Sequence, residues 1–257
     1  MLPTRPSVVI KFPADMKLPP EKKDWRLMRH MFWTIAPRYD FVTRMFSFGM
    51  DSGWKETAVR EAVLPQRPVV LDLACGTGDF ARLVPRFCPG ARVVALDLTE
   101  EMLRRARRRG VHTVICGNAL ALPFADATFD GVFVGYGLRN FPDLPAALGE
   151  ICRVTRPGGL MVSLDFFLPP NRLLRSLFLG WLYAQGAFWG LALHGRSRVY
   201  TYIPDSLRGF LSIQDLSRHL QSLGYGEVRE RRYVFGGIGL HRAVKGPETS
   251  RQERRPS

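Results

Sequence analysis

Short apolar runs of strand length alternate with segments of helical periodicity through the middle of the chain. The runs are PVVLDLA, ARVVALDL, VHTVICG, FDGVFVGY and GGLMVSLDFF, in that order. Between most of them, apolar residues recur at the three- and four-residue spacing of a helix, as in GDFARLVPRF and DLPAALGEICRVT. Strands separated by single helices form a parallel, doubly wound sheet, so the pattern predicts the α/β class.

The two ends of the chain depart from this alternation. Residues 24–60 have a helical pattern, and the apolar stretch 171–193 follows the fifth strand and predicts a helical lid insertion over about 171–210. Two further strands, EVRERRYVF and GIGLHRAVK, meet at Gly236-Gly237, as in a hairpin. An antiparallel hairpin at the end of a Rossmann-like parallel sheet is typical of class I methyltransferases that use S-adenosylmethionine.

We therefore predict a single methyltransferase domain over residues 24–245. Residues 1–23 are rich in Pro and Lys, have no apolar stretch of signal-peptide length, and predict a mobile leader. Residues 246–257 are polar and predict a disordered tail. The run 177–193 carries no charge and is at the lower limit of membrane-span length, but Gln185 and three glycines favour buried or interfacial helices.

The charge of the chain favours an anionic partner. It has 37 Lys and Arg against 23 Asp and Glu, a formal net charge of +14 over 257 residues, which suits nucleic acid or acidic lipid. Part of it lies in runs that a solvated surface would also explain: Arg104, Arg105, Arg107, Arg108 and Arg109, with Arg251, Arg254 and Arg255 in the tail. The four cysteines have no metal-ligand spacing and indicate a reducing, cytoplasmic compartment.

A glycine pair directly follows the first strand. Gly76 and Gly78 stand at the start of a helix, where a backbone without Cβ atoms can approach a ligand closely and adopt positive φ. The string Gly76-x-Gly78-x-x-Ala81 also satisfies a loose dinucleotide pattern, with Asp97 placed to hold a ribose. Taken alone, the loop fits a dehydrogenase as well as a methyltransferase.

Residues around the loop favour the methyltransferase. Asp72, inside the first strand, would repel a pyrophosphate but can face a methionyl ammonium; a carboxylate that stabilises the turn is the alternative. Asp97 ends the second strand and suits two ribose hydroxyls, since a carboxylate there costs free energy without a partner. After the third strand, Asn118 can hydrogen-bond an adenine edge, with Ala119 as a small wall beside it.

The string GYGLRNF follows the fourth strand and delivers two polar residues, Arg139 and Asn140, side by side among glycines. At the carboxyl edge of a doubly wound sheet, such a pair suits a ligand with oxygen atoms. A structural ion pair with a turn cap is the alternative interpretation.

With these residues in place, the chain resembles the ubiquinone/menaquinone biosynthesis C-methyltransferases over about residues 31–244. The strings that carry the resemblance are MFWTIAPRYD, SFGMDSGW, LDLACGTGDF, LDLTEEML, NALALPFADATFD, GLRNF, RVTRPGG and GIGLH. The resemblance implies an enzyme that methylates a ring carbon of a polyprenylated quinol with S-adenosylmethionine and without a metal. It also implies that Thr77, Asp97, Asn118 and Ala119 contact the cofactor.

Four positions depart from the family pattern. Thr43, Gly135, Asp165 and Arg198 replace, respectively, the usual Asn, Ser, Glu and acidic residue. None of them removes the cofactor chemistry, and together they bear on the shape of the quinol pocket.

The implied reaction needs a ring carbon made nucleophilic by the loss of a neighbouring hydroxyl proton. Arg139 can stabilise the resulting oxyanion, and Asn140 can orient it. His241, in the last strand, is the candidate proton acceptor by its ordinary pKa, with a structural histidine as the alternative. Tyr39 and Asp40 can close the pocket from the N-terminal helices.

The substrate ring stays open between a naphthoquinol and a methoxybenzoquinol, and the pocket departures favour demethylmenaquinol. A lipid-soluble substrate and a basic surface predict peripheral contact with an anionic membrane, at the inner face of the cell membrane, and a homo-oligomer is compatible with the sequence. Three other functions stay open: a nucleic-acid methyltransferase, a small-molecule O- or N-methyltransferase, and a membrane-binding protein without catalysis. We expect no nucleic-acid partner, because the Asn/Asp-Pro-Pro-aromatic string of base-amino methylation does not follow the fourth strand.

Overall fold

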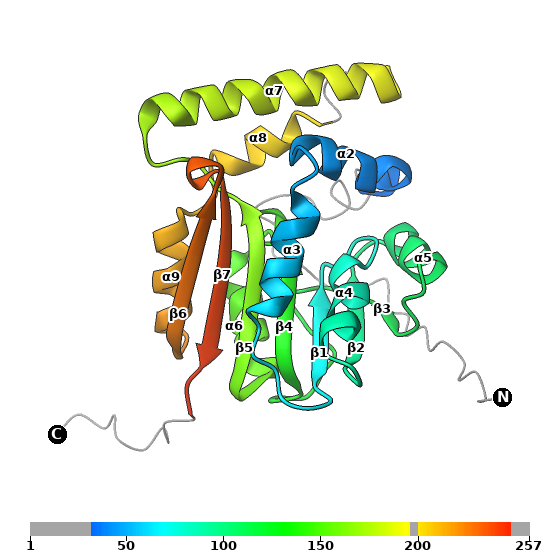
Figure 1. Ribbon diagram of the computed structural model, residues 1–257, viewed down its shortest axis with the longest axis vertical. Helices are drawn as coiled ribbons and strands as arrows, with labels where there is room; N and C mark the ends of the chain where they lie inside the picture. The colour runs from blue at the N-terminus through cyan, green and yellow to red at the C-terminus, as the bar shows by residue number, and fades with distance from the viewer. Residues whose placement is uncertain (1–31, 196–199, 248–257) are drawn as a thin grey trace.

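The strands form one mixed sheet in the computed structural model, which describes residues 32–195 and 200–247 (Figure 1). In spatial order the sheet is β3-β2-β1-β4-β5-β7-β6. The strands are β1 (Val69–Leu73), β2 (Arg92–Asp97), β3 (Val114–Cys116), β4 (Phe129–Gly135), β5 (Thr155–Phe166), β6 (Tyr225–Tyr233) and β7 (Ile238–Lys245). The predicted leader, Arg198 and the tail beyond residue 247 lie outside the described residues.

The first five strands run parallel, and β7 enters antiparallel between β5 and β6. β6 and β7 form the predicted hairpin, joined through the short turn η4 (Val234–Gly236). β1 pairs with β2 on one side and with β4 on the other, so the order of the strands reverses between β1 and β4. Ligands of open α/β sheets bind at such a switch point, beyond the carboxyl ends of the strands. The parallel sheet with a terminal hairpin confirms the predicted fold class.

Helices cover both faces of the sheet. They are α2 (Tyr39–Phe46), α3 (Asp51–Arg60), α4 (Asp79–Phe87), α5 (Glu100–Arg108), α6 (Leu144–Val154), α7 (Arg172–His194), α8 (Tyr202–Leu207) and α9 (Ile213–Ser222), with 3₁₀ turns η1 (Ala36–Arg38) and η2 (Leu138–Asn140). Side chains of α3 and α4 pack into one hydrophobic cluster, and those of α6 and α9 pack into another.

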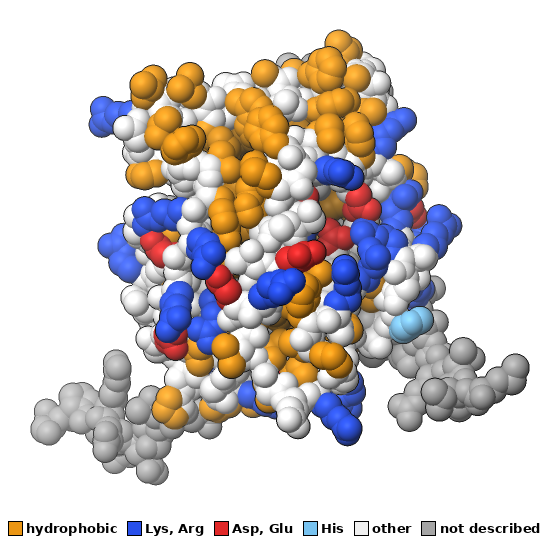
Figure 2. Space-filling view, in the orientation of Figure 1, with side chains coloured by type: hydrophobic (Ala, Val, Ile, Leu, Met, Phe, Trp, Pro, Cys, Tyr) orange, Lys and Arg blue, Asp and Glu red, His pale blue; other side chains and the backbone are white. Residues whose placement is uncertain are grey.

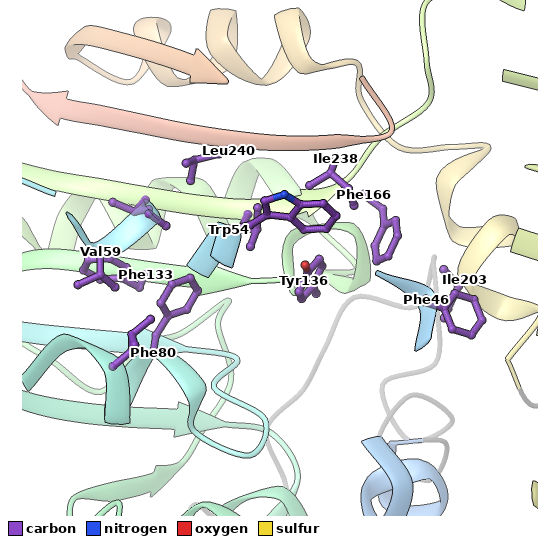
Figure 3. Packing of buried hydrophobic residues seen from close by; sticks show 14 of the residues in the cluster. Phe46, Trp54, Val59, Phe80, Phe133, Tyr136, Phe166, Ile203, Ile238 and Leu240 are labelled. Carbon is purple, nitrogen blue, oxygen red and sulfur yellow. The ribbon is translucent and has the colours of Figure 1, made fainter. Parts of the chain in front are cut away.

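Alternate residues of the central strands supply these two clusters. Val70 and Phe133 point to the α3 and α4 side, where Phe80 packs against Phe133 with ring centroids 5.3 Å apart (Figure 3). Leu71 and Val132 point to the α6 and α9 side, because successive side chains of a strand face opposite ways. The first cluster continues past the strand ends and takes in residues of α2 and α8, so these helices belong to the same core.

The apolar insertion forms one continuous helix, α7, of 23 residues. Asn171 caps its N-terminus, because its side chain accepts hydrogen bonds from the N–H groups of Leu173 and Leu174. Gly195, in the left-handed conformation, caps its C-terminus. α7 lies across the carboxyl end of the sheet, beside α8 and α2 (Figure 1). Of the helices in the described residues, none combines the length and the apolarity that crossing a membrane requires.

Candidate active site

A cleft opens at the carboxyl ends of β1, β2 and β4, where the strand order reverses. This main cleft encloses about 850 Å³ of open space. The predicted site residues that line it are Tyr39, Gly76, Asp97, Asn118, Ala119 and Asn140. Phe32, ahead of α2, also lines the cleft, so the N-terminal segment covers the loop that follows β1.

The two glycines of that loop meet different needs. Gly76 has a φ of 54°, in the left-handed region that favours glycine, and a Cβ there would make only an ordinary contact, at 3.6 Å, with the ring of Tyr39. Gly78 has a φ of 83°, and a Cβ would lie 2.6 Å from Cγ2 of Val111. Gly78 therefore lets α4 pack closely against α5, and it does not line the main cleft.

Asp97, at the end of β2, is the acidic residue of the cleft wall. Its carboxylate accepts the N–H of Gly76 at 2.9 Å and the N–H of Thr99 at 2.8 Å. Burial raises the pKa of Asp97 although these hydrogen bonds oppose the shift. A carboxylate oxygen can accept more than one hydrogen bond, so Asp97 can also accept from ligand hydroxyls.

Asn118 and Ala119 form the wall beyond β3. The side-chain oxygen of Asn118 accepts the N–H of Leu120 at 3.0 Å, which leaves its amide NH2 group as a donor for a ligand. Ala119 is 7% exposed and presents only a methyl group to the cleft. This corner suits a flat ring with an acceptor nitrogen.

Asp72 lies beneath the glycine loop and does not line the cleft. Its Oδ2 accepts the N–H of Ala81 at 2.8 Å, in the first turn of α4. Burial raises the pKa of Asp72 well above its usual value. The structure thus gives this carboxylate the turn-stabilising contact that the sequence left as the alternative.

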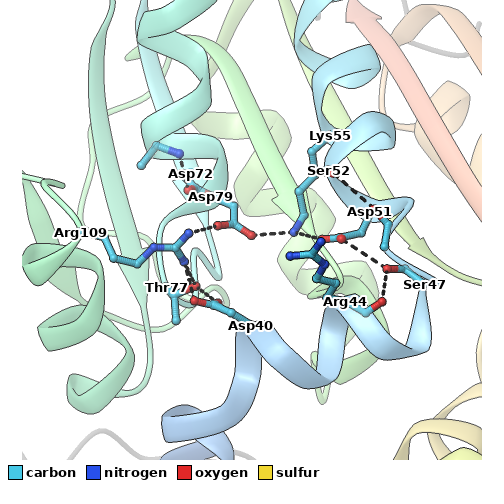
Figure 4. A network of polar contacts seen from close by, with 12 residues as sticks. Asp40, Arg44, Ser47, Asp51, Ser52, Lys55, Asp72, Thr77, Asp79 and Arg109 are labelled. Atoms are coloured by element: carbon cyan, nitrogen blue, oxygen red, sulfur yellow. Dashed lines mark hydrogen bonds and ion pairs between the residues drawn. The ribbon is translucent and has the colours of Figure 1, made fainter.

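A polar network ties the N-terminal helices to the glycine loop (Figure 4). The hydroxyl of Thr77 donates to Asp40 of α2 at 2.6 Å, and the guanidinium of Arg109 donates to both residues at 2.6 and 2.9 Å. Arg109 also pairs with Asp79 at 2.9 Å. Asp79 in turn accepts from Lys55 of α3 at 2.6 Å. Asp40 and Thr77 are therefore joined to each other and lie outside the lining of the main cleft.

The charges of this network stabilise one another. Burial opposes the ionisation of Asp79, but Lys55 and Arg109 outweigh it and lower the pKa of Asp79. Burial likewise opposes the charge of Lys55, and the neighbouring Asp79 and Asp51 outweigh it and raise the pKa of Lys55. Both groups stay charged at neutral pH, so α3 is linked to α4 by an ion pair between the buried Lys55 and the half-buried Asp79.

The glycines of GYGLRNF bring two loops into contact. A Cβ at Gly135 would lie 2.9 Å from the ring of Phe80, and one at Gly137 would lie 2.9 Å from Cβ of Ala74, in the loop after β1. Between them, Tyr136 has a φ of 58° and lines the main cleft. The glycines are thus required by packing at the switch point.

Arg139 and Asn140 face different spaces. Asn140 lines the main cleft; its Nδ2 donates to the carbonyl of Tyr136 at 3.2 Å, and its Oδ1 is buried without a hydrogen-bond partner among the described residues. Arg139 is 6% exposed, pairs with Asp165 of β5 and donates to the same Tyr136 carbonyl at 2.8 Å. The two side chains diverge because η2 is a 3₁₀ turn, in which consecutive side chains are about 120° apart.

Arg139 lines a second, smaller space, which we name the inner cavity. It has an empty volume of about 370 Å³. Its other walls are Ile35, Val42, Thr43, Phe46, Phe166, Tyr200, Tyr202 and Ile203. Tyr39 and Tyr136 line both the inner cavity and the main cleft, so the two spaces share these walls.

The inner cavity combines one permanent cation with neutral phenols. Burial opposes the charge of Arg139, but Asp165 outweighs it and raises the pKa of the guanidinium. Burial raises the pKa of Tyr39, and it raises that of Tyr202 although Arg139 opposes the shift. The phenols therefore stay protonated and can donate hydrogen bonds, so the cavity can stabilise a negative oxygen on an apolar ring.

His241 lies away from both spaces. It is 1% exposed, its Nε2 hydrogen-bonds the carbonyl of Ile213 in α9 at 3.0 Å, and its ring packs against Phe167. Its neighbour Leu240 points into the cluster on the opposite face of the sheet. Burial lowers the pKa of His241. The structure does not bring this residue to the other candidate catalytic groups.

Several residues of the two spaces escaped the sequence analysis as site residues. Tyr136 is quoted in GYGLRNF, but only its positive φ turns it into the wall between the spaces. Thr43 and Asp165 stood out only as departures from a family pattern. Thr43 lines the inner cavity, and Asp165 forms an ion pair with Arg139 in its wall. Tyr202 lies on α8, and no local pattern indicates where a short helix after a long insertion packs.

Comparisons with known proteins agree with this arrangement. The family model described as the ubiE/COQ5 methyltransferase family matches residues 20–245. A demethylmenaquinone methyltransferase of Thermus thermophilus is 38% identical over 82% of this chain and 98% of its own. A ubiquinone/menaquinone biosynthesis C-methyltransferase UbiE of Desulfotalea psychrophila is 36% identical over 84% of this chain and 89% of its own.

Solved structures share the fold. A possible histamine N-methyltransferase of Thermotoga maritima, described as S-adenosylmethionine-dependent, superposes with a TM-score of 0.60 at 22% identity, over 85% of this chain and 99% of its own. A putative S-adenosylmethionine-dependent methyltransferase of Methanococcus maripaludis also gives 0.60, at 14% identity, over 91% of this chain and 100% of its own. The fold is the class I methyltransferase fold.

Proposed function

This chain belongs to the ubiE/COQ5 methyltransferase family, and we propose that it methylates a ring carbon of demethylmenaquinol, a polyprenylated hydronaphthoquinone, with S-adenosylmethionine as methyl donor. One observation carries the choice: the inner cavity has a buried guanidinium among aromatic and aliphatic walls, and it meets the main cleft at Tyr39 and Tyr136. A flat apolar ring with a hydroxyl oxygen fits those walls. The Thermus thermophilus relative is named for demethylmenaquinone.

The donor set of the main cleft fits the cofactor. S-adenosylmethionine supplies an electrophilic methyl group on a positively charged sulfur. Asp97 has acceptor positions for two ribose hydroxyls, Asn118 has a donor for an adenine ring nitrogen, and Ala119 leaves room for that ring. The Oδ1 of Asn140 is buried and has no hydrogen-bond partner in the described part of the chain, so it suits an N–H donor, and the methionyl ammonium is one. Gly76 lets the ligand approach the backbone beside Tyr39.

Other predicted residues support the cofactor indirectly in this proposal. Asp72 holds the first turn of α4, and Gly78 sets its packing on α5. Thr77 and Asp40 fasten α2 to the loop, which keeps Tyr39 over the cleft. We assign them to positioning rather than to contact with the reacting atoms.

In this proposal Arg139 activates the substrate for methylation. Its guanidinium favours the ionised quinol hydroxyl, whose proton passes to solvent, and the oxyanion makes the adjacent ring carbon nucleophilic. That carbon would take the methyl group from the sulfonium sulfur, which would keep the electron pair of the broken S–C bond, and the carbon would then lose its own proton to solvent. Asp165 holds the guanidinium at the cavity wall, and the phenols of Tyr39 and Tyr202 can donate to the same oxygen. The ring carbon then faces the main cleft between Tyr39 and Tyr136.

A methoxybenzoquinol is the second candidate substrate. The Desulfotalea psychrophila relative is named for both ubiquinone and menaquinone biosynthesis, and a smaller ring also fits between the walls of the inner cavity. The two substrates place a hydroxyl beside the methylated carbon, so Arg139 serves the same purpose in both.

The test is turnover of the purified full chain with methyl-labelled S-adenosylmethionine. One arm contains reduced demethylmenaquinone in detergent micelles and the other a reduced methoxybenzoquinone. We expect label in the naphthoquinol, and we expect Arg139→Ala to lower kcat by about 10²–10³-fold while cofactor affinity stays within about threefold. Label only in the benzoquinol would replace the substrate and keep the reaction, whereas no label in either, with cofactor bound, would refute the proposal.

Two further variants keep the Arg139 result interpretable. Removing Arg139 alone leaves Asp165 buried without its cation, which destabilises the fold. The double variant Arg139→Leu and Asp165→Leu removes both charges and is expected to fold and bind the cofactor, yet to turn over as slowly as Arg139→Ala. Arg218→Ala, at a side chain that is 74% exposed, is the matched control and should leave kcat unchanged.

We also infer the setting in which the enzyme works. A net charge of +14 and a lipid-soluble substrate support peripheral attachment at the inner face of the cell membrane. We propose that α7 and α8 act as the lid of a single domain spanning about residues 24–245, because they cover the end of the sheet next to the inner cavity. A homo-oligomer stays compatible with this setting.

A further inference from the structure

The outward face of α7 is apolar along most of its length, with Ser176 as an exposed polar residue near its start. Its exposed residues at helical spacing are Leu173, Leu177, Gly180, Ala184, Phe188 and Leu191. The four large ones are 68, 62, 60 and 63% exposed, in that order. The spacing of three and four residues places them on one side of the helix. We name this set the outer α7 stripe.

The opposite side of α7 is apolar as well, but it is buried. Phe178 and Leu182 pack into the hydrophobic cluster beneath the helix, and Gly186 lies against the backbone of Tyr200. A helix that faces water normally has a polar outer side, as α9 does with Gln214, Arg218 and His219. The outer α7 stripe is therefore a surface for an apolar partner rather than for water.

Basic groups flank the outer α7 stripe at both ends. Arg172 and Arg175 stand in the first turn of α7, and Arg38 donates to the carbonyl of Leu193 in its last turn. Beside that last turn, Phe41 packs on Trp189 with ring centroids 5.1 Å apart. Figure 2 shows hydrophobic side chains gathered over the part of the molecule that contains α7, α8 and α2, with basic side chains at its margins.

A groove lined by arginines adjoins Phe41. Arg38, Arg105, Arg108 and Arg109 line it together with Phe41, and it has an empty volume of about 680 Å³. An apolar stripe with cations at its margins has the charge and polarity pattern of a helix that lies in the headgroup region of an anionic membrane.

We propose that α7 lies in the plane of an anionic lipid bilayer, with the outer α7 stripe in the acyl region and the flanking arginines on lipid phosphates. This partner rests on the proposed function, in which the substrate is a membrane lipid. The inner cavity then lies near the bilayer, because the ring of Phe46 in its wall packs against the ring of Trp181 of α7, with ring centroids 6.2 Å apart. A polyprenyl quinol can enter from the membrane without its chain crossing water.

Charge favours the bilayer over a second copy of this chain. α7 contains two arginines and no acidic residue from Arg172 to His194. Two copies that packed their outer α7 stripes antiparallel would bring the arginines of one first turn near Arg38 at the other's last turn. Like charges would then meet with no carboxylate on either helix to pair with them.

The test is flotation of the full chain with lipid vesicles. It compares the wild type with a double variant that carries both Leu177→Glu and Phe188→Glu. Vesicles of phosphatidylcholine with phosphatidylglycerol should bind wild type, added salt should weaken binding, and pure phosphatidylcholine should bind less. The double variant should lose at least about tenfold in partition coefficient. Val63→Glu is the matched control, since Val63 is 77% exposed and follows the end of α3, and it should bind as wild type does.

Four results would overturn the proposal. They are absence of vesicle binding by wild type, unchanged binding by the double variant, equal loss in Val63→Glu, and a wild-type dimer without vesicles that the double variant converts to monomer. Turnover of a short-chain quinol in micelles is measured in parallel. If the double variant keeps that turnover, it is folded; if wild type binds vesicles but methylates no quinol, the proposed function fails and the docking surface stands.

Discussion

The main cleft and the inner cavity share two tyrosine walls, yet they are held in place by different forces. In the main cleft, backbone groups fix the ligand-facing residues: Asp97 is held by two N–H groups and Asn118 by a third. In the inner cavity, Arg139 is held by the buried carboxylate of Asp165 and by aromatic packing. The guanidinium carbon of Arg139 lies 5.2 Å from the centroid of the Phe166 ring. Backbone contacts are set by the strand and turn geometry, whereas side-chain contacts depend on the residues chosen.

This difference separates two kinds of damage. Changes in the main cleft are expected to affect folding and cofactor affinity together, because the loop and the sheet share hydrogen bonds. Changes in the inner cavity that leave no buried charge unpaired are expected to affect turnover and leave the sheet intact, as proposed for the double variant of Arg139 and Asp165. Three further variants sharpen the comparison, in order of decreasing effect.

Gly78→Ala should have the largest effect on stability. A Cβ at φ +83° costs about 1–2 kcal/mol, and its contact with Val111 at 2.6 Å adds about 1–3 kcal/mol of overpacking. Gly110→Ala is the matched control, because Gly110 has a φ of +90° but no atom within 4 Å of the added Cβ. Urea unfolding should show a larger loss for Gly78→Ala, and equal losses would contradict the packing role of Gly78.

Asp97→Asn should weaken cofactor binding without slowing the bound enzyme. The neutral amide of the variant accepts weaker hydrogen bonds from the ribose hydroxyls than the carboxylate does. The Kd of S-adenosylmethionine, measured by calorimetry, should therefore rise about 10–100-fold. At saturating cofactor, kcat should stay within about threefold of wild type. Asp126→Asn is the control, since the side chain of Asp126 is 80% exposed. An unchanged Kd would remove Asp97 from the cofactor site.

His241→Gln should change the pH dependence of stability and leave turnover intact. Burial lowers the pKa of His241 in the native state, so the unfolded chain binds the proton at a higher pH than the folded chain does. The contribution of neutral His241 to native stability is therefore present above the unfolded-state pKa of about 6.5, and it is lost as the pH falls below that pKa. The variant should lose less stability than wild type between about pH 8 and 5.5, by up to about 1 kcal/mol. His219→Gln, at an exposed site, is the control, and a collapse of kcat in His241→Gln would restore its catalytic role.

The sequence predicted the backbone of the cleft better than the direction of its side chains. The parallel sheet, the terminal hairpin and the edge that gathers Gly76, Asp97 and Asn118 all follow from periodicity and from the geometry of parallel strands. Arg139 and Asn140 were predicted as one pair, and the 3₁₀ turn that separates them has no local signal of its own. His241 was judged by its ordinary pKa, which burial against α9 changes.

The residues that line the two spaces also come from different parts of the sequence, and this has a consequence for how the enzyme can evolve. The described residues that line the main cleft all lie between Phe32 and Pro142, whereas the inner cavity also needs Phe166, Tyr200, Tyr202 and Ile203. Substitutions after Pro142 can therefore alter which ring the enzyme accepts without touching a wall that holds the methyl donor. Descendants of one ancestor can acquire new acceptors by exchanging the segment after β5, while the inherited glycine loop stays unchanged.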